Sequence, residues 1–183
     1  MDTDQLPVGK TFSWHSSLLR ALWFGLLLIF FDAFLFDSWV ISILVIVAVF
    51  LKFSFAATRY GLFGRPFSKL LIRNYTIYVA AAVLALGINI GNNILARHRA
   101  ENIVAAIEAY HVKYGDYPKS LEVMAPEFMG HIPLAKYNLS LNTFYYRYSP
   151  TARKNEPTFF YTIIPPFYRN FYDFEKREWR AMD

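Results

Sequence analysis

Two long runs of apolar residues constrain what this chain of 183 residues can fold into. Between residues 21 and 51 the only charged side chains are Asp32 and Asp37, and residues 74–95 contain none. A helix needs about 20 apolar residues to cross the roughly 30 Å of hydrocarbon in a bilayer. The two runs therefore predict an integral membrane protein, in agreement with a composition that is 55% hydrophobic.

The first run is too long for one crossing, and we interpret it as a helical hairpin. One helix is expected over about residues 18–36 and a second over about 39–57. Asp37 and Ser38 form the turn between them, where either side chain is expected to cap the second helix. A third span is expected over about 75–94. The first segment is too long for a signal peptide and lacks a small-residue cleavage pattern, so we expect it to be retained.

The distribution of cations predicts the orientation in the membrane. Short loops rich in Lys and Arg stay in the cytoplasm. Arg97 and Arg99, just beyond the third span, favour the opposite orientation, but they are outnumbered. We therefore expect the N-terminus and the basic loop in the cytoplasm of a bacterium, and the Asp37 turn and everything after Ile94 in the periplasm. The basic loop and its edges contain five cations and no acid: Lys52, Arg59, Arg65, Lys69 and Arg73.

These boundaries divide the chain into five parts. Residues 1–17 are a cytoplasmic tail, 18–57 the transmembrane hairpin and 58–73 the basic cytoplasmic loop. Residues 74–95 are the third transmembrane helix, and 96–183 are a periplasmic α+β domain.

The net charge of +5 does not indicate nucleic-acid binding. From Leu95 onward the chain has twelve Lys and Arg against ten Asp and Glu, so the excess positive charge belongs to the membrane loop. A basic loop with aromatic residues among its cations suits an anionic lipid surface. We therefore expect membrane lipids as partners and no nucleic acid.

The periplasmic domain is expected to begin with a long amphipathic stalk helix. Apolar residues recur at spacings of three and four from Ala100 to Tyr114, and no Pro or Gly separates this segment from the third span. Gly115 is expected to end the helix. Ser120 is an expected N-cap for a short helix that ends near Pro126. Segments rich in aromatic and β-branched residues predict strands over 143–149, 158–164, 170–174 and 177–182, with a turn at 175–176.

The stalk and the loop after it carry a family resemblance over about residues 75–183. They resemble the helix-to-loop junction of type IV pilins and type II secretion pseudopilins. The resemblance implies a membrane helix that continues as a stalk, ends at a Gly-x-Tyr-Pro turn and packs against a small antiparallel sheet. Gly115, Tyr117 and Pro118 define that turn. The residues that carry the resemblance are Ala100, Glu101, Asn102, Ile103, Ala106, Ile107, Tyr110, Tyr114, Gly115, Asp116, Tyr117, Pro118, Ser120 and Leu121.

Three features of the predicted spans suggest specific roles for individual residues. Asp32 is interpreted as an interfacial carboxylate that reaches water, with a proton relay or a buried contact to a partner subunit as alternatives. Gly87 and Gly91 form a Gly-x-x-x-Gly pair that lets helix backbones approach closely. They are expected to pack onto the hairpin or onto another protein. Three asparagines near the outer end of the third span are expected to mark the water boundary: Asn89, Asn92 and Asn93.

The sequence contains no catalytic signature. It lacks a Gly-x-Ser-x-Gly elbow, a phosphate-binding glycine loop and a His-Glu-x-x-His motif, and it has no cysteine. Asp173 and Glu175 are isolated in sequence, and we expect neither a metal nor a cofactor. The many rings of the C-terminal half are expected to form a core, with a glycan or lipid platform as the alternative.

These features predict a non-enzymatic accessory or scaffolding subunit of a bacterial inner-membrane complex. Its transmembrane helices would dock against other membrane-protein subunits, and a homo-oligomer is compatible with the same features. Two other functions stay open: a component of type IV pilus or type II secretion machinery, and a glycan- or lipid-binding or transport component.

Overall fold

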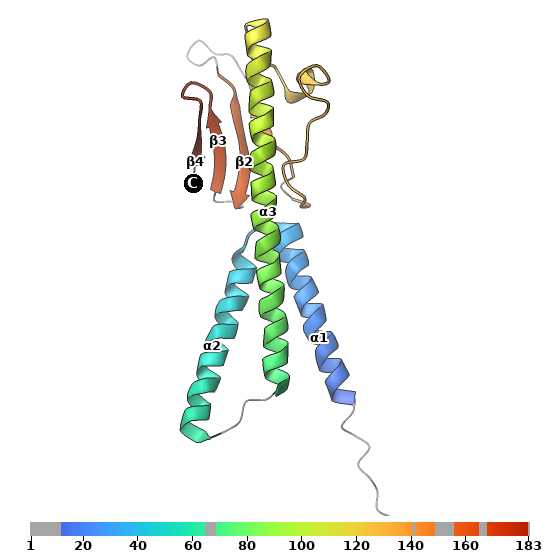
Figure 1. Ribbon diagram of the computed structural model, residues 1–183, viewed down its shortest axis with the longest axis vertical. Coiled ribbons are helices and arrows are strands. Elements are labelled where there is room, and N and C mark those ends of the chain that lie inside the picture. The colour runs from blue at the N-terminus through green and yellow to red at the C-terminus, as the bar shows by residue number, and fades with distance from the viewer. Residues whose placement is uncertain (1–11, 65–68, 141, 149–155, 165–167, 183) are drawn as a thin grey trace, which may run out of the picture. The chain divides into compact units, whose positions relative to one another are not determined.

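The computed structural model describes residues 12–64, 69–140, 142–148, 156–164 and 168–182 (Figure 1). Three long helices account for most of these residues, and a four-stranded antiparallel sheet follows them. The chain divides into two compact units. We call residues 1–32 and 39–86 the helical unit, and residues 33–38 and 87–183 the head.

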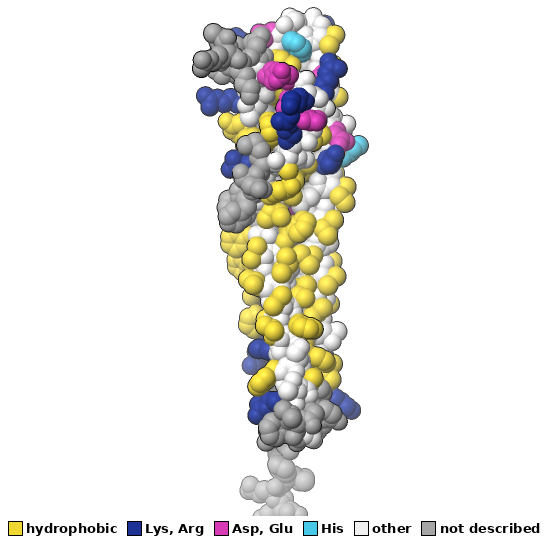
Figure 2. All heavy atoms as spheres, turned by 90° about the vertical axis from the view of Figure 1, so that its left-hand side faces the viewer, with side chains coloured by type: hydrophobic (Ala, Val, Ile, Leu, Met, Phe, Trp, Pro, Cys, Tyr) yellow, Lys and Arg dark blue, Asp and Glu magenta, His cyan; other side chains and the backbone are white. Residues whose placement is uncertain are grey.

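All three helices contribute to the helical unit. Helix α1 (Phe12–Ile29) continues into a π-helical segment, η1 (Phe30–Phe36), and α2 (Val40–Phe63) follows the turn. Helix α3 (Lys69–Tyr114) enters the unit with its first half. Each helix contains a segment long and apolar enough to cross a membrane, as the sequence predicted. Figure 2 shows hydrophobic side chains over these helices and Lys and Arg at one end of them.

Packing within the helical unit is uneven. Gly25 on α1 lies against α3, where a Cβ built on Gly25 would be 3.2 Å from the Cβ of Ala81. Asn74 Nδ2 donates a hydrogen bond to Ser17 Oγ at 3.0 Å. Only 6% of the apolar segment of α2 is buried, against 28% for the segment of α1 and η1. The structure therefore pairs α1 with α3 more closely than it packs α2.

Helix α3 runs without a break for 46 residues and ends where the sequence predicted. Gly115 adopts a φ of 76°, and its N–H donates to His111 O at 2.8 Å. This left-handed conformation suits glycine because it has no Cβ. The prediction that one unbroken helix covers the third apolar run and the amphipathic segment after it is confirmed.

The head contains a sheet in the order β1-β2-β3-β4, with all neighbouring strands antiparallel. Three of the four predicted strands match the observed ones closely, and β1 is shorter than expected. Residues 174–177 form the turn before the last strand, where Arg177 has a φ of 53°. The strands are β1 (Tyr145–Arg147), β2 (Thr158–Ile164), β3 (Tyr168–Asp173) and β4 (Glu178–Met182).

The core of the head forms between one face of the sheet and α3. Alternate residues of β2, Phe159 and Tyr161, are buried together with Ile103 and Ile107 of α3. The Trp179 ring lies 6.1 Å from the ring of Phe159 and 5.8 Å from that of Tyr161. Aromatic side chains of this size bury on the order of 150–250 Å² each, so the inner rings add a large apolar area to the aliphatic core residues of α3.

The segment between α3 and the sheet packs around the Gly-x-Tyr-Pro turn. The Tyr117 ring stacks on His111 with centroids 4.1 Å apart, and Tyr146 donates from its hydroxyl to Pro118 O at 2.6 Å. The expected short helix is a 3₁₀ turn, η2 (Leu121–Met124). Ser120 occupies its N-cap position, but its side chain forms no capping hydrogen bond. A single 3₁₀ turn leaves little unsatisfied backbone for a cap to stabilise.

Candidate functional site

A buried ion pair in the head joins two segments that lie far apart in sequence. Lys136, in the loop before the sheet, bonds through Nζ to the carboxylate of Asp37 in the turn between η1 and α2. Both side chains are 0% exposed. Lys136 Nζ also donates to the carbonyl oxygen of Ile163 on β2, at 3.0 Å. The lysine thus connects the turn to the sheet.

Hydrogen bonds on either side strengthen this connection. The Leu139 N–H donates to Phe34 O at 2.8 Å, and the hydroxyl of Ser140 donates to Leu35 O. These contacts satisfy carbonyl groups that the end of a helix leaves without intrahelical partners. The end of η1 and the turn after it, residues 33–38, are therefore part of the head. We call residues 134–140 the clamp loop.

The clamp loop is also anchored to α3. Asn92 Oδ1 accepts a hydrogen bond from the Tyr137 N–H at 3.3 Å. Arg99 donates to Leu134 O at 2.7 Å and to the Tyr137 hydroxyl at 2.6 Å, and its guanidinium lies 4.7 Å from the centre of the Tyr137 ring. From the sequence, Asn92 was expected to mark the water boundary and Arg99 to be a cation just beyond the third span.

Burial of the asparagines corrects the expectation that they mark the water boundary. Asn89 is 0% exposed and Asn92 is 6% exposed. The amide of Asn89 has no hydrogen-bond partner among the described residues. The head places Asn92 under the clamp loop, where it satisfies a backbone N–H that would otherwise be buried without a partner.

The buried charges of Lys136 and Asp37 compensate each other, so the pair has a structural role. Burial lowers the pKa of Lys136, while the hydrogen bond and charge of the Asp37 carboxylate act in the opposite direction. Taking a charged group out of water is costly unless a partner and hydrogen bonds compensate it. The backbone at Asp37 has a φ of 49°, a conformation that Asp and Asn tolerate better than most residues. The pair fixes the turn.

Asp32 is the second buried carboxylate, and its environment corrects our interpretation of it as a group that reaches water. Its side chain is 0% exposed. One carboxylate oxygen accepts hydrogen bonds from the Ser42 N–H, at 3.2 Å, and from the Ser42 hydroxyl. Ser42 lies in the first turn of α2, where backbone N–H groups lack intrahelical acceptors. Asp32 therefore caps α2 from η1, a role that we had expected of Asp37 or Ser38.

The glycine pair of the third span faces open space within the chain. A Cβ built on Gly87 or Gly91 meets no atom of the described residues within 4 Å. Within the helical unit, a close helix approach occurs at Gly25. Packing of Gly87 and Gly91 onto the hairpin or onto another protein stays a prediction.

The predicted basic surface lies at the end of the helical unit near the loop. Lys52, Arg59 and Lys69 are exposed, and Arg59 lies over the Phe55 ring at 5.6 Å. Arg73 is partly buried, and its Nη2 lies 3.4 Å from Asn74 Oδ1. Arg65 lies outside the described residues.

An acidic group in the head was missed by the sequence analysis. Carboxylate oxygens of Glu156, Asp173 and Glu175 lie within 4.8 Å of one another, a spacing that could hold a metal ion. Asp173 already accepts from the Lys176 N–H at 3.0 Å and pairs with Arg180 at 3.4 Å. Both contacts help to lower the pKa of Asp173. Glu156 was missed because it belongs to a segment before β2, distant in sequence from the other two.

Comparison of the chain with models of protein families, with curated proteins and with solved structures finds no match.

Proposed function

We propose that this protein is a non-enzymatic accessory subunit of a bacterial inner-membrane complex. Its transmembrane helices dock against other subunits, and its head is presented on the periplasmic side. Two features support the proposal: the exposed apolar surface of α2 and the rigidly held head.

The observation that carries the proposal is the exposure of α2. Its apolar segment is 6% buried, and large side chains project from several of its faces. Leu44 is 61% exposed, Phe50 is 68% exposed and Phe55 is 66% exposed. A passive anchor needs only one crossing, whereas α2 adds a second apolar helix with little packing inside its own chain. Gly87 and Gly91 add a small-residue surface of the kind that favours close helix contacts in bilayers.

The head supports a presenting role. Most of its aromatic rings belong to the core. Its buried ion pair, Lys136–Asp37, holds residues 33–38 against the rest of the head. Among the described residues, Arg99, Lys136 and Asn92 Oδ1 each form structural hydrogen bonds around the clamp loop. Such an arrangement suits a stable surface for protein contacts better than a reaction centre.

Site-specific photo-crosslinking in native membranes tests the docking role. A crosslinking residue at Leu44 or Phe50 of α2 is expected to capture a defined membrane subunit, while one at the buried Ala82 is not. The same subunit should co-purify with the wild-type chain and be lost when α2 is replaced by a leucine-rich span that still inserts. A chain that crosslinks only to lipid and migrates alone in mild detergent would contradict the proposal.

A component of type IV pilus or type II secretion machinery is the second candidate. The unbroken 46-residue helix, the Gly115 stop and the antiparallel sheet packed on the stalk favour it. The crosslinked subunit distinguishes the two candidates, because an assembly ATPase or inner-membrane platform protein of that machinery would favour the second.

A further inference from the structure

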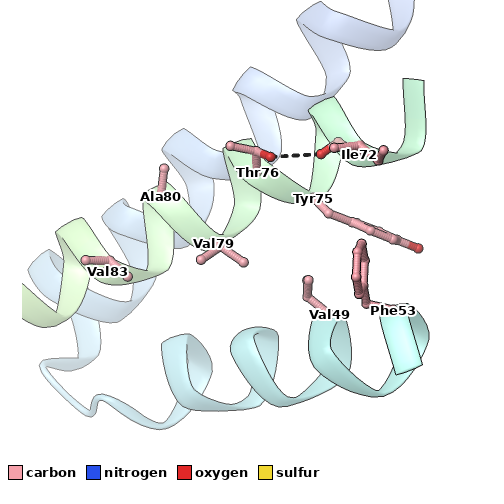
Figure 3. A pocket seen from close by; sticks show the side chains of 8 residues that line it. All are labelled: Val49, Phe53, Ile72, Tyr75, Thr76, Val79, Ala80 and Val83. Carbon is pink, nitrogen blue, oxygen red and sulfur yellow. Dashed lines mark hydrogen bonds between the residues drawn. The ribbon is translucent and has the colours of Figure 1, made fainter. Parts of the chain in front are cut away.

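An apolar groove lies between α2 and α3 within the helical unit (Figure 3). Its volume is about 420 Å³, within the roughly 300–1,000 Å³ of ligand sites in proteins. Phe53 and Val83 in its walls are 45% and 57% exposed, so the groove is open along its side. The lining residues are Val49, Phe53, Ile72, Tyr75, Thr76, Val79, Ala80 and Val83.

One end of the groove carries an aromatic pair. In Figure 3 the ring of Tyr75 lies beside the ring of Phe53, at the end of the groove near Ile72. Thr76 uses its hydroxyl to donate to Ile72 O at 3.0 Å, so this hydroxyl is already engaged by its own helix. The Tyr75 phenol is the polar group that the lining can offer to a ligand at this end.

Two lysines lie near the aromatic pair, one on each helix. Lys69 precedes Ile72 by three residues and Thr76 by seven, so it lies beyond the pair on the face of α3 that lines the groove. On α2, Lys52 lies between Val49 and Phe53, at the level of the pair. Both lysines are exposed. The two helices that form this end of the apolar groove thus each carry a positive charge.

We propose that this groove binds one anionic phospholipid. An acyl chain lies along the apolar walls, the phosphate is held by Lys52 and Lys69, and the Tyr75 hydroxyl donates to the headgroup or glycerol region. The proposal goes beyond the docking function, because it assigns a lipid to a defined site rather than to a basic surface.

A second groove shows why the charges select this occupant. It has a volume of about 530 Å³ and is lined by residues of all three helices, including Phe24, Val45 and Tyr78. The lining residues of both grooves are uncharged, and the second groove has one cation nearby, Arg20, four residues before Phe24. The α2–α3 groove differs because two lysines, one on each of its helices, complement a headgroup with a negative charge.

Native mass spectrometry and thermal unfolding of the full-length protein in detergent test the proposal. Phosphatidylglycerol is expected to stay bound at one molecule per chain and to raise the unfolding temperature, whereas phosphatidylcholine with the same chains is not. Each cation contributes about fivefold to such a preference. The Lys52→Gln/Lys69→Gln variant should therefore lose roughly 25-fold in affinity for phosphatidylglycerol.

Matched variants separate a defined site from a general surface. Arg20→Gln removes a cation from α1, away from the groove, and should leave the affinity unchanged. Val79→Trp should fill the groove and abolish binding, whereas Val45→Trp in the second groove should not. Equal helicity of all variants by circular dichroism confirms that they fold.

Several results would overturn the proposal. Equal binding of the two lipids, an equal loss for Arg20→Gln, or unchanged binding by Val79→Trp would each do so. Glycerol phosphate alone should give no shift, and a shift from it would assign the cations to a free phosphate. A lipid-free dimer whose interface crosslinks through Phe53 would assign the groove to a second copy.

Discussion

Lys136 and Asp37 form an ion pair across 99 positions of sequence, and neither side chain reaches the surface. The contact makes the short turn between η1 and α2 part of the head. Breaking a buried pair by removing one partner is more damaging than replacing both, because the remaining charge stays buried without compensation.

Single substitutions at the pair are therefore expected to destabilise the head by about 3–5 kcal/mol. Asp37→Asn keeps a residue that tolerates the positive φ, and Lys136→Met keeps the apolar stem, so each removes mainly the charge. The double variant should recover part of the loss. Thermal unfolding followed by near-ultraviolet circular dichroism measures these changes. Arg97→Gln, which removes an exposed pair with Glu101, is the control and should cost about 0.3–0.5 kcal/mol. A double variant as unstable as the worse single variant would contradict the coupling.

Tyrosines of the head are expected to make it sensitive to alkaline pH. A hydrogen bond to Asp116 raises the pKa of Tyr148 to about 12, and burial raises the pKa of Tyr172 to about 12. Between about pH 10 and 12 the unfolded chain has lost these protons while the folded chain keeps them, so stability falls as pH rises. Tyr148→Phe should make this decline shallower. Phenolate absorbance during an alkaline titration gives the pKa values, and titration of all tyrosines near pH 10 would contradict the prediction.

Loss of the Asp32 cap is expected to weaken the start of α2. Asp32→Ala removes the acceptor of the Ser42 N–H and should cost about 0.5–2 kcal/mol, the range for other caps. Asp32→Asn keeps an acceptor oxygen and should cost less. Thermal loss of helicity in detergent compares the two variants. If Asp32→Asn leaves stability unchanged but abolishes partner binding, the carboxylate has a role in partner contact instead.

Glycine substitutions are expected to separate folding from docking. Gly25→Leu should disrupt the packing of α1 on α3, because its Cβ alone would be 3.2 Å from Ala81. Gly87→Leu and Gly91→Leu meet open space and should leave folding intact. Under the proposed function they should reduce co-purification of the partner subunit. Normal partner recovery with both substitutions would remove this surface from the docking model.

The orientation is expected to place the head in the periplasm. Because the chain has no cysteine, single cysteines can be labelled without background. Lys176→Cys, in the exposed turn before β4, should react with an impermeant maleimide in spheroplasts, whereas Arg59→Cys should react only after lysis. Labelling of both positions from the same side would overturn the topology.

Local patterns predicted most of the elements. Apolar runs long enough to cross a bilayer predicted the three helices. The absence of Pro or Gly between Leu95 and Gly115 predicted that the third helix continues without a break. The concentration of aromatic and β-branched residues in 158–164 predicted β2, because such residues favour strands. These signals are local in sequence, so the elements follow from them directly.

Long-range contacts account for the errors. Lys136 is an ordinary loop lysine in sequence, and no periodicity connects it with Asp37. Asp32 was assigned to water because sequence shows depth in a membrane but not the bend that brings η1 to Ser42. The close approach of Gly25 to α3 was not predicted, because Gly25 has no glycine partner four residues away to make it conspicuous.

The place of the turn at residues 33–38 in the head also has a consequence for biogenesis. The carboxylate that neutralises Lys136 is synthesised 99 residues before the lysine, in the turn that joins η1 to α2. A domain cut from these helices would fold around an uncompensated ammonium group. Correct placement of the first two helices is therefore a condition for maturation of the domain that follows them.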